Sequence, residues 1–86
     1  MSKLDSLIRT AKFYEKTQKA IAEKIGIAET KFSDWKKGKT KPTAYEIMQI
    51  AELARLEPIS AFCEIMAEIE PEHKNFWQER NKIVVR

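Results

Sequence analysis

The chain has few of the residues that stabilise small proteins through disulfides or metal ions. It contains one cysteine, Cys63, and one histidine, His73, among 86 residues. One cysteine cannot form an internal disulfide, and one histidine cannot build a metal site alone. These counts also leave no Ser-His-Asp or Cys-His constellation, and there is no glycine-rich phosphate loop. We therefore expect a protein of a reducing cytoplasm without enzymatic activity or cofactors, with Cys63 in the core and His73 exposed near a helix end.

The sequence also lacks a long apolar run. No segment approaches the roughly 18 apolar residues of a membrane helix. The N-terminus, MSKLDSLIRT, has neither the apolar core nor the small-residue cleavage site of a signal peptide. Neither membrane insertion nor export is predicted.

Strand signals are nearly absent, and glycine and proline are scarce. Two glycines and three prolines accompany 43% hydrophobic and 34% charged residues, which is typical of a folded helical protein rather than a disordered chain. The length predicts one domain with a thin core. We expect an all-α fold with five helices over residues 1–70, and a tail at 71–86 that forms a further helix or a short strand.

Positive charge is unevenly distributed along the chain. Residues 1–42 contain eleven Lys and Arg against five Asp and Glu, whereas residues 43–86 contain five against eight. A basic half joined to an acidic half suggests that one face meets a polyanion and the other does not. Ordinary solubilising charge explains the composition about equally well, so charge alone does not decide the function.

The first two helices are predicted from apolar spacing and from residues that begin or end helices. One runs over 3–15, with Ser2 and Asp5 as a capping pair. The next begins at Thr17. It ends at Gly26, because glycine readily accepts the left-handed conformation that closes a helix.

Three more helices follow from similar signals. The third starts at Glu29 and ends at Gly38. Thr43 and Glu46 have the spacing of a capping box, which opens the fourth helix. Proline suits the first turn of a helix and cannot continue one, so the fifth helix is predicted between Pro58 and Pro71.

Two short helices joined by a glycine turn, at residues 17–37, have the plan of a helix-turn-helix. The second of them, here called the reading helix, must bury one side on the domain and leave the other free to enter a major groove. Phe32 and Trp35 lie at helical spacing and are predicted to be core. The positions facing away from them are all polar: Glu29, Thr30, Ser33, Asp34 and Lys37.

Lysines cluster where the chain leaves the reading helix, at Lys36, Lys37, Lys39 and Lys41. Lysine is a point charge suited to phosphate, and phosphate contacts supply affinity and register without sequence information. Because such contacts release counterions, binding through them weakens steeply with salt. The stretch favours double-stranded DNA as a partner.

Residues 17–43, TQKAIAEKIGIAETKFSDWKKGKTKPT, resemble the helix-turn-helix of the Cro/lambda-repressor-like (XRE-type) family. The segment YEIMQIAELARLEP resembles the helix that follows in that family, and the similarity covers roughly residues 4–69. It implies a compact DNA-binding domain over 1–70, of the kind found in small phage or prophage repressors. The matching features are Thr17-Gln18, Ala22, Gly26, WKKG at 35–38 and KTKP at 39–42.

The resemblance also implies roles for individual residues. Gln18 matches a position that contacts a phosphate and supports the reading helix. The base-reading candidates are Glu29, Thr30, Lys31, Ser33 and Asp34. The phosphate candidates are Gln18, Lys19, Lys36, Lys37, Lys39, Thr40 and Lys41.

Two features depart from the family pattern. Ala28 stands where a Ser or Thr cap is usual, which costs about 1 kcal/mol and is partly offset by Glu29 at the positive end of the helix. Glu29 and Asp34 are acidic at reading positions. A carboxylate accepts from the cytosine amino group but repels phosphate. Either the protein reads C·G pairs or Glu29 is only a helix-end charge; Thr30 and Lys31 are slightly favoured over it as base contacts.

These features predict a sequence-specific, nucleoid-associated transcriptional repressor that binds a palindromic operator as a homodimer. The tail either folds back onto the domain or forms the dimer contact, and the fifth helix is about as good a candidate for that contact as the tail. Two alternatives stay open: an antitoxin whose tail binds a second protein, and a protein-interaction module that has lost DNA binding. The dimer candidates are Phe62, Met66, Phe76, Trp77, Ile83 and Val85.

Overall fold

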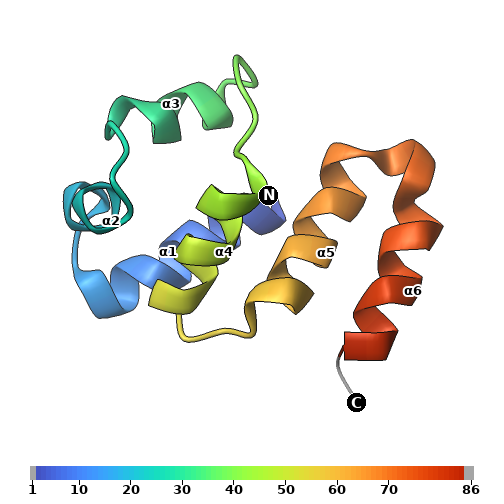
Figure 1. Cartoon of the computed structure of the whole chain (residues 1–86). Coiled ribbons are helices and arrows are strands. Elements are labelled where there is room, and N and C mark those ends of the chain that lie inside the picture. Colours follow the sequence, from blue (N-terminus) through green and yellow to red (C-terminus); the bar gives the residue numbers. More distant parts are fainter. Residues whose placement is uncertain (1, 85–86) are drawn as a thin grey trace.

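The computed structural model describes residues 2–84 and is all-helical, without strands, over that range. The all-α prediction is confirmed. Figure 1 shows the helices in chain order. Their bounds are α1 Lys3–Glu15, α2 Gln18–Ile25, α3 Thr30–Lys36, α4 Ala44–Leu53, α5 Pro58–Ile69, the 3-10 turn η1 Pro71–His73, and α6 Lys74–Val84.

The first two helices begin at the predicted capping residues. Ser2 Oγ accepts the backbone N–H of Asp5 at 3.0 Å, and Thr17 Oγ1 accepts that of Ala20 at 3.1 Å. Each bond satisfies an N–H that has no partner inside the helix. Gly26 ends α2 with a φ of 80°, in the left-handed region. The predicted bounds of these helices are confirmed.

The fourth helix opens with the predicted capping box. The backbone N–H of Glu46 donates to Thr43 Oγ1 at 3.2 Å, and that of Thr43 donates to Glu46 Oε1 at 2.7 Å. Pro58 occupies the first turn of α5, where its missing N–H leaves no unsatisfied partner. Glu57 caps that helix by accepting two N–H bonds, and the helix ends before Pro71.

The main core lies where α1, α2 and α4 meet, and side chains of α3 and α5 close it. Ile21, Ile47 and Ile50 are its largest fully buried side chains. Burying one such side chain stabilises the fold by about 1.5–3 kcal/mol. The whole cluster comprises Leu7, Ile8, Ala11, Ile21, Ala22, Ile25, Phe32, Trp35, Ile47, Ile50, Ala51, Ala54 and Ile65.

The C-terminal segment is a helix that runs antiparallel to α5 and packs along it (Figure 1). Phe62 and Trp77 form an edge-to-face pair with ring centroids 5.6 Å apart, and Trp77 Nε1 donates to Glu70 Oε1 at 3.0 Å. These contacts fold the tail back onto the domain, so the strand alternative is wrong over the described residues. Cys63 is buried in α5 and His73 is exposed, as predicted.

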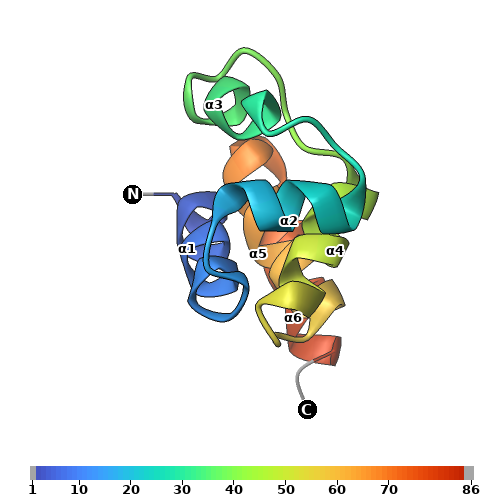
Figure 2. The ribbon, with the colours of Figure 1, turned by 90° about the vertical axis from the view of Figure 1, so that its left-hand side faces the viewer.

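The reading helix and the C-terminal helix lie far apart. Figures 1 and 2 both show α3 at one edge of the molecule, with α6 away from it. In Figure 1, α2 is seen end-on and α3 lies across the view, whereas Figure 2 shows the reverse, so the two helices cross steeply. None of the helices over residues 2–84 is long and apolar enough to cross a membrane.

Candidate nucleic-acid interface

The reading helix is α3, which begins one residue later than predicted. Glu29 is its N-terminal boundary residue rather than its first turn. Its side chain makes no capping hydrogen bond, so its carboxylate acts only through its charge at the helix end. Ala28 leaves the helix without a side-chain cap, as the sequence predicts.

Two aromatic side chains fix α3 on the domain. Phe32 is 3% exposed and Trp35 is 8% exposed. Their rings meet edge to face with centroids 5.3 Å apart, a favoured geometry for aromatic pairs. The prediction that both belong to the core is confirmed, and it excludes them as stacking platforms for bases.

The opposite side of α3 carries polar side chains in solvent. Thr30, Ser33 and Lys37 are exposed there, and Glu29 is exposed at the helix start. Asp34 is only half-buried, so it lies at the border between this face and the domain. Four of these five candidates therefore share one accessible surface.

The start of α2 and this face of α3 line the same concavity, which has a volume of about 390 Å³. Gln18 of α2 lies in it beside Thr30 and Ser33 of α3. The two helices thus present side chains to one shared depression, and Gln18 lies in it although it is far from Thr30 in sequence. Its lining is completed by Glu29, Phe32 and Lys36.

A basic segment follows α3 directly. Gly38, with a φ of 76°, closes the helix. The Gly38 N–H donates to the Trp35 carbonyl at 3.1 Å and the Lys39 N–H to the Asp34 carbonyl at 2.9 Å, which is the double bond pattern of a Schellman closure. The predicted end of the helix is confirmed. The basic segment 36–41 begins at the last residue of α3 and continues through this closure.

The lysines of this segment have no intramolecular partner in the described part of the chain. Lys36, Lys37, Lys39 and Lys41 are exposed and make no ion pair or side-chain hydrogen bond within residues 2–84. Two further phosphate candidates, Lys19 and Thr40, are exposed as well.

Lys31 lies differently from the other base-reading candidates. Its Nζ is 2.8 Å from Glu46 Oε2, and the other oxygen of that carboxylate accepts the backbone N–H of Thr43. The Glu46 side chain is 5% exposed and that of Lys31 is 46% exposed. This contact is not predictable from the sequence, because the spacing of Thr43 and Glu46 indicates only a cap on α4.

The electrostatics of Glu46 follow from these partners. Burial raises the pKa of its carboxyl. The hydrogen bonds from Lys31 and the Thr43 backbone, together with the charge of Lys31, outweigh burial, so the pKa lies below its ordinary value. The carboxylate therefore remains ionised at neutral pH.

The dimer candidates divide into two groups. Phe62, Met66 and Trp77 are half-buried, and Phe62 and Trp77 face each other within the chain. Phe76 is 49% exposed and Ile83 is 62% exposed on α6. Val85 lies outside the described residues.

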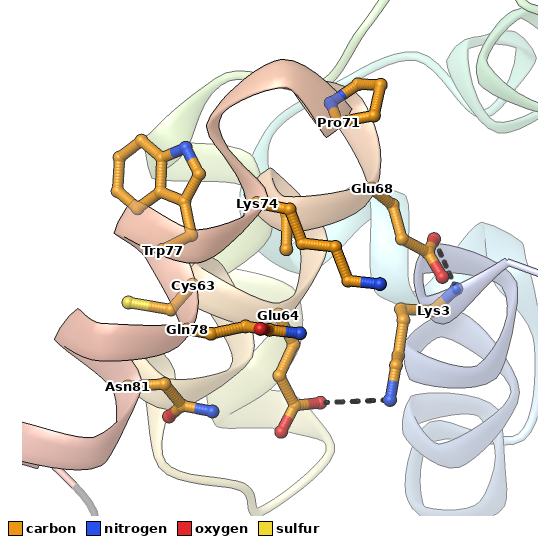
Figure 3. Close-up of a pocket in the computed structure, with 10 residues that line it drawn as sticks. Lys3, Cys63, Glu64, Glu68, Pro71, Lys74, Trp77, Gln78 and Asn81 are labelled. Atoms are coloured by element: carbon orange, nitrogen blue, oxygen red, sulfur yellow. Dashed lines mark hydrogen bonds and ion pairs between the residues drawn. The ribbon is translucent and has the colours of Figure 1, made fainter.

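A second cavity, of about 590 Å³, lies between the start of α1 and the α5–α6 pair (Figure 3). Glu64 and Glu68 reach across it toward Lys3. Lys3 Nζ is 3.8 Å from Glu64 Oε1, and the Lys3 backbone N–H donates to Glu68 Oε1 at 2.7 Å. The charged groups at this end thus serve to tie α1 to α5.

Comparison with known proteins identifies no relative. The sequence matches no protein-family model, and no curated protein or solved structure is significantly similar to it.

Proposed function

We propose that this protein is a sequence-specific DNA-binding transcriptional repressor with a lambda-repressor-like fold, and that α3 enters the major groove. The observation that carries the proposal is the unpaired lysine segment at 36–41, placed directly after a helix whose polar side is exposed. The steep crossing of α2 and α3 (Figures 1 and 2) supports the same reading.

The proposed contacts follow from accessibility. Thr30 and Ser33 reach base edges, since a hydroxyl both donates and accepts and suits any base. Gln18 holds a phosphate beside them, and the lysines after α3 bind the flanking backbone. Glu29, exposed at the helix start, disfavours phosphate nearby and tolerates a cytosine amino group.

The protein acts as a homodimer in this proposal. A short reading helix covers few base pairs, and pairing two of them on a palindrome raises both affinity and specificity. The exposed apolar residues Phe76 and Ile83 belong to α6, a helix that lies away from α3 (Figure 1), and they support α6 as the pairing surface. Ile83→Asp is expected to yield monomers in sedimentation equilibrium, while Ile83→Leu stays dimeric.

The test of DNA reading is selection from a random duplex pool, followed by footprinting on DNA flanking the protein's own gene. We expect a palindromic consensus. Thr30→Ala and Ser33→Ala should each relax it at particular positions, with a loss of about 1 kcal/mol. Ser6→Ala removes an exposed hydroxyl from α1 and is the matched control.

Other outcomes would point to the alternatives. Binding that ignores sequence would overturn the repressor proposal. No mobility shift with any duplex would favour a protein-interaction module. Co-purification of a second chain that is lost on Ile83→Asp would favour an antitoxin.

A further inference from the structure

The reading helix has little to hold it besides a few side chains. It spans seven residues, and an isolated helix of that length is not stable in water. Over the described residues, the backbone of α3 does not pack closely against that of any other helix, unlike the backbones of α1, α2, α4, α5 and α6. Its orientation on the domain is therefore set by its own buried and bonded side chains.

Three side chains do this, and they differ in kind. Phe32 and Trp35 are buried in the core, but apolar contact is not directional. Lys31 makes a charge-assisted hydrogen bond of 2.8 Å to Glu46, and such bonds depend on direction as well as distance.

The acceptor of that bond is itself fixed. Glu46 is 4% exposed, and its second oxygen is held by the Thr43 N–H at 2.7 Å. The capping box of α4 therefore places a carboxylate at a defined point, and Lys31 attaches α3 to that point. Through these two contacts, the start of α4 sets the orientation of the exposed face of α3 relative to the domain.

We propose that Lys31 is a positioning residue of the reading helix and that Glu46 is its fixed anchor, so that the pair controls how accurately Thr30 and Ser33 are presented to base edges. This inference rests on the proposed DNA-binding function. Lys31 acts in it through Glu46 rather than by touching a base, unlike the role that the sequence favoured.

The first arm of the test measures binding to the selected operator and to a random duplex. Lys31→Met removes the ammonium. Glu46→Gln removes the charge but keeps an oxygen for the Thr43 N–H. Each variant should weaken operator binding roughly threefold to tenfold and leave random-duplex binding and its salt dependence nearly unchanged. The double variant should be no weaker than either single one, and Lys31→Arg should restore operator binding.

The second arm needs no DNA. Amide hydrogen exchange of the free protein should accelerate over residues 31–39 in Lys31→Met and Glu46→Gln, while α1 and α5 stay protected. Lys24→Met is the matched control, because Lys24 makes a comparable ion pair with Glu15 at 2.9 Å between α2 and α1. It should leave exchange in α3 unchanged.

Two results would overturn the inference. Equal losses on both duplexes in Lys31→Met, with a salt slope shallower by about one, would make Lys31 a phosphate contact. Unchanged exchange over residues 31–39 would show that the pair does not hold α3. If the wild-type protein binds no DNA at all, the proposed function fails, and the exchange arm still decides whether the pair positions the helix.

Discussion

The segment from α3 to the start of α4 and the α5–α6 pair use their charged residues in opposite ways. In the first, the lysines after α3 are exposed and unpaired within the described residues. In the second, acidic side chains have structural partners: Glu57 caps α5, Glu70 accepts the Trp77 indole N–H, and Glu64 and Glu68 bind Lys3. The two regions thus differ in how available their charged groups are for a partner.

This contrast indicates which charged side chains are available to a ligand. A polyanion would meet a cluster of uncommitted ammonium groups, those of Lys36, Lys37, Lys39 and Lys41, along the edge formed by α3 and the loop after it. The carboxylates on and next to α5 already have partners: Glu57 caps the helix, and Glu64 and Glu68 contact Lys3 of α1. The two regions also differ in how they are held: α3 by a few side chains, and α6 by packing along the length of α5.

The largest expected effect comes from the two tryptophans, one in each region. Trp35→Ala should lower the free energy of unfolding by about 3–5 kcal/mol, because it empties a buried site. Trp77→Ala should cost only about 2 kcal/mol, since Trp77 is half-buried. Urea unfolding followed by circular dichroism measures both. Equal losses would show that the two regions are equally important to the core.

Removing lysines from one region or the other should separate local from overall charge. Lys37→Ala with Lys39→Ala should weaken DNA binding tenfold to a hundredfold at about 0.1 M salt and reduce the salt slope by about two. Lys74→Ala with Lys82→Ala removes the same charge from α6 and should change binding little. Titrations at several salt concentrations provide the measurement. Similar losses in the two double variants would mean that net charge alone attracts DNA.

The closure of α3 should be sensitive to the backbone conformation of one residue. Gly38 has a φ of 76°, and a Cβ added there would meet no atom within 4 Å. Gly38→Ala should therefore cost about 1–2 kcal/mol through backbone strain alone. Thermal unfolding measures it, and Gly26→Ala, at a φ of 80° with equally open surroundings, should cost about the same. A Gly38 variant as stable as the wild type would show that the Schellman closure is not needed.

The smallest expected effect is pH-dependent. The pKa of Glu46 is lowered in the folded protein, so its stabilising contribution is present above the pKa of the unfolded chain and is lost as pH falls through the folded value. Glu46→Gln should be about 1 kcal/mol less stable than the wild type at pH 7, and the gap should narrow as the pH falls through the lowered pKa of Glu46. Urea midpoints measured from neutral into acidic pH test this. A gap that stays constant over that range would assign the loss to altered packing.

Much of the fold followed from local sequence signals. Ser2, Thr17 and Thr43 cap the helices that they were expected to cap, and Gly26 and Gly38 end theirs. Such signals act within a few residues, so their outcome depends little on the rest of the chain. The burial of Phe32 and Trp35 followed in the same way from helical spacing.

Contacts between distant residues were not predictable in the same way. The tail pattern alone fits either a strand or a helix, and packing on Phe62, a contact between segments, accompanies the helix that forms. Lys31 is separated by 15 residues from Glu46, and nothing in its own helix distinguishes it from the other lysines. The sequence therefore predicts which residues belong to the candidate site. Which of them are exposed and which contact the domain is seen only in the tertiary structure.

The alternation of roles along α3 has a consequence for how the protein could change over generations. Residues 31, 32 and 35 attach the helix to the domain, whereas Thr30, just before them, and Ser33, between Phe32 and Trp35, are exposed to solvent. Substitutions at these two positions carry almost no folding penalty, so new side chains can be sampled there without a compensating mutation elsewhere. If the proposed DNA-binding function holds, a lineage of such proteins would drift from one target sequence to another through single viable steps.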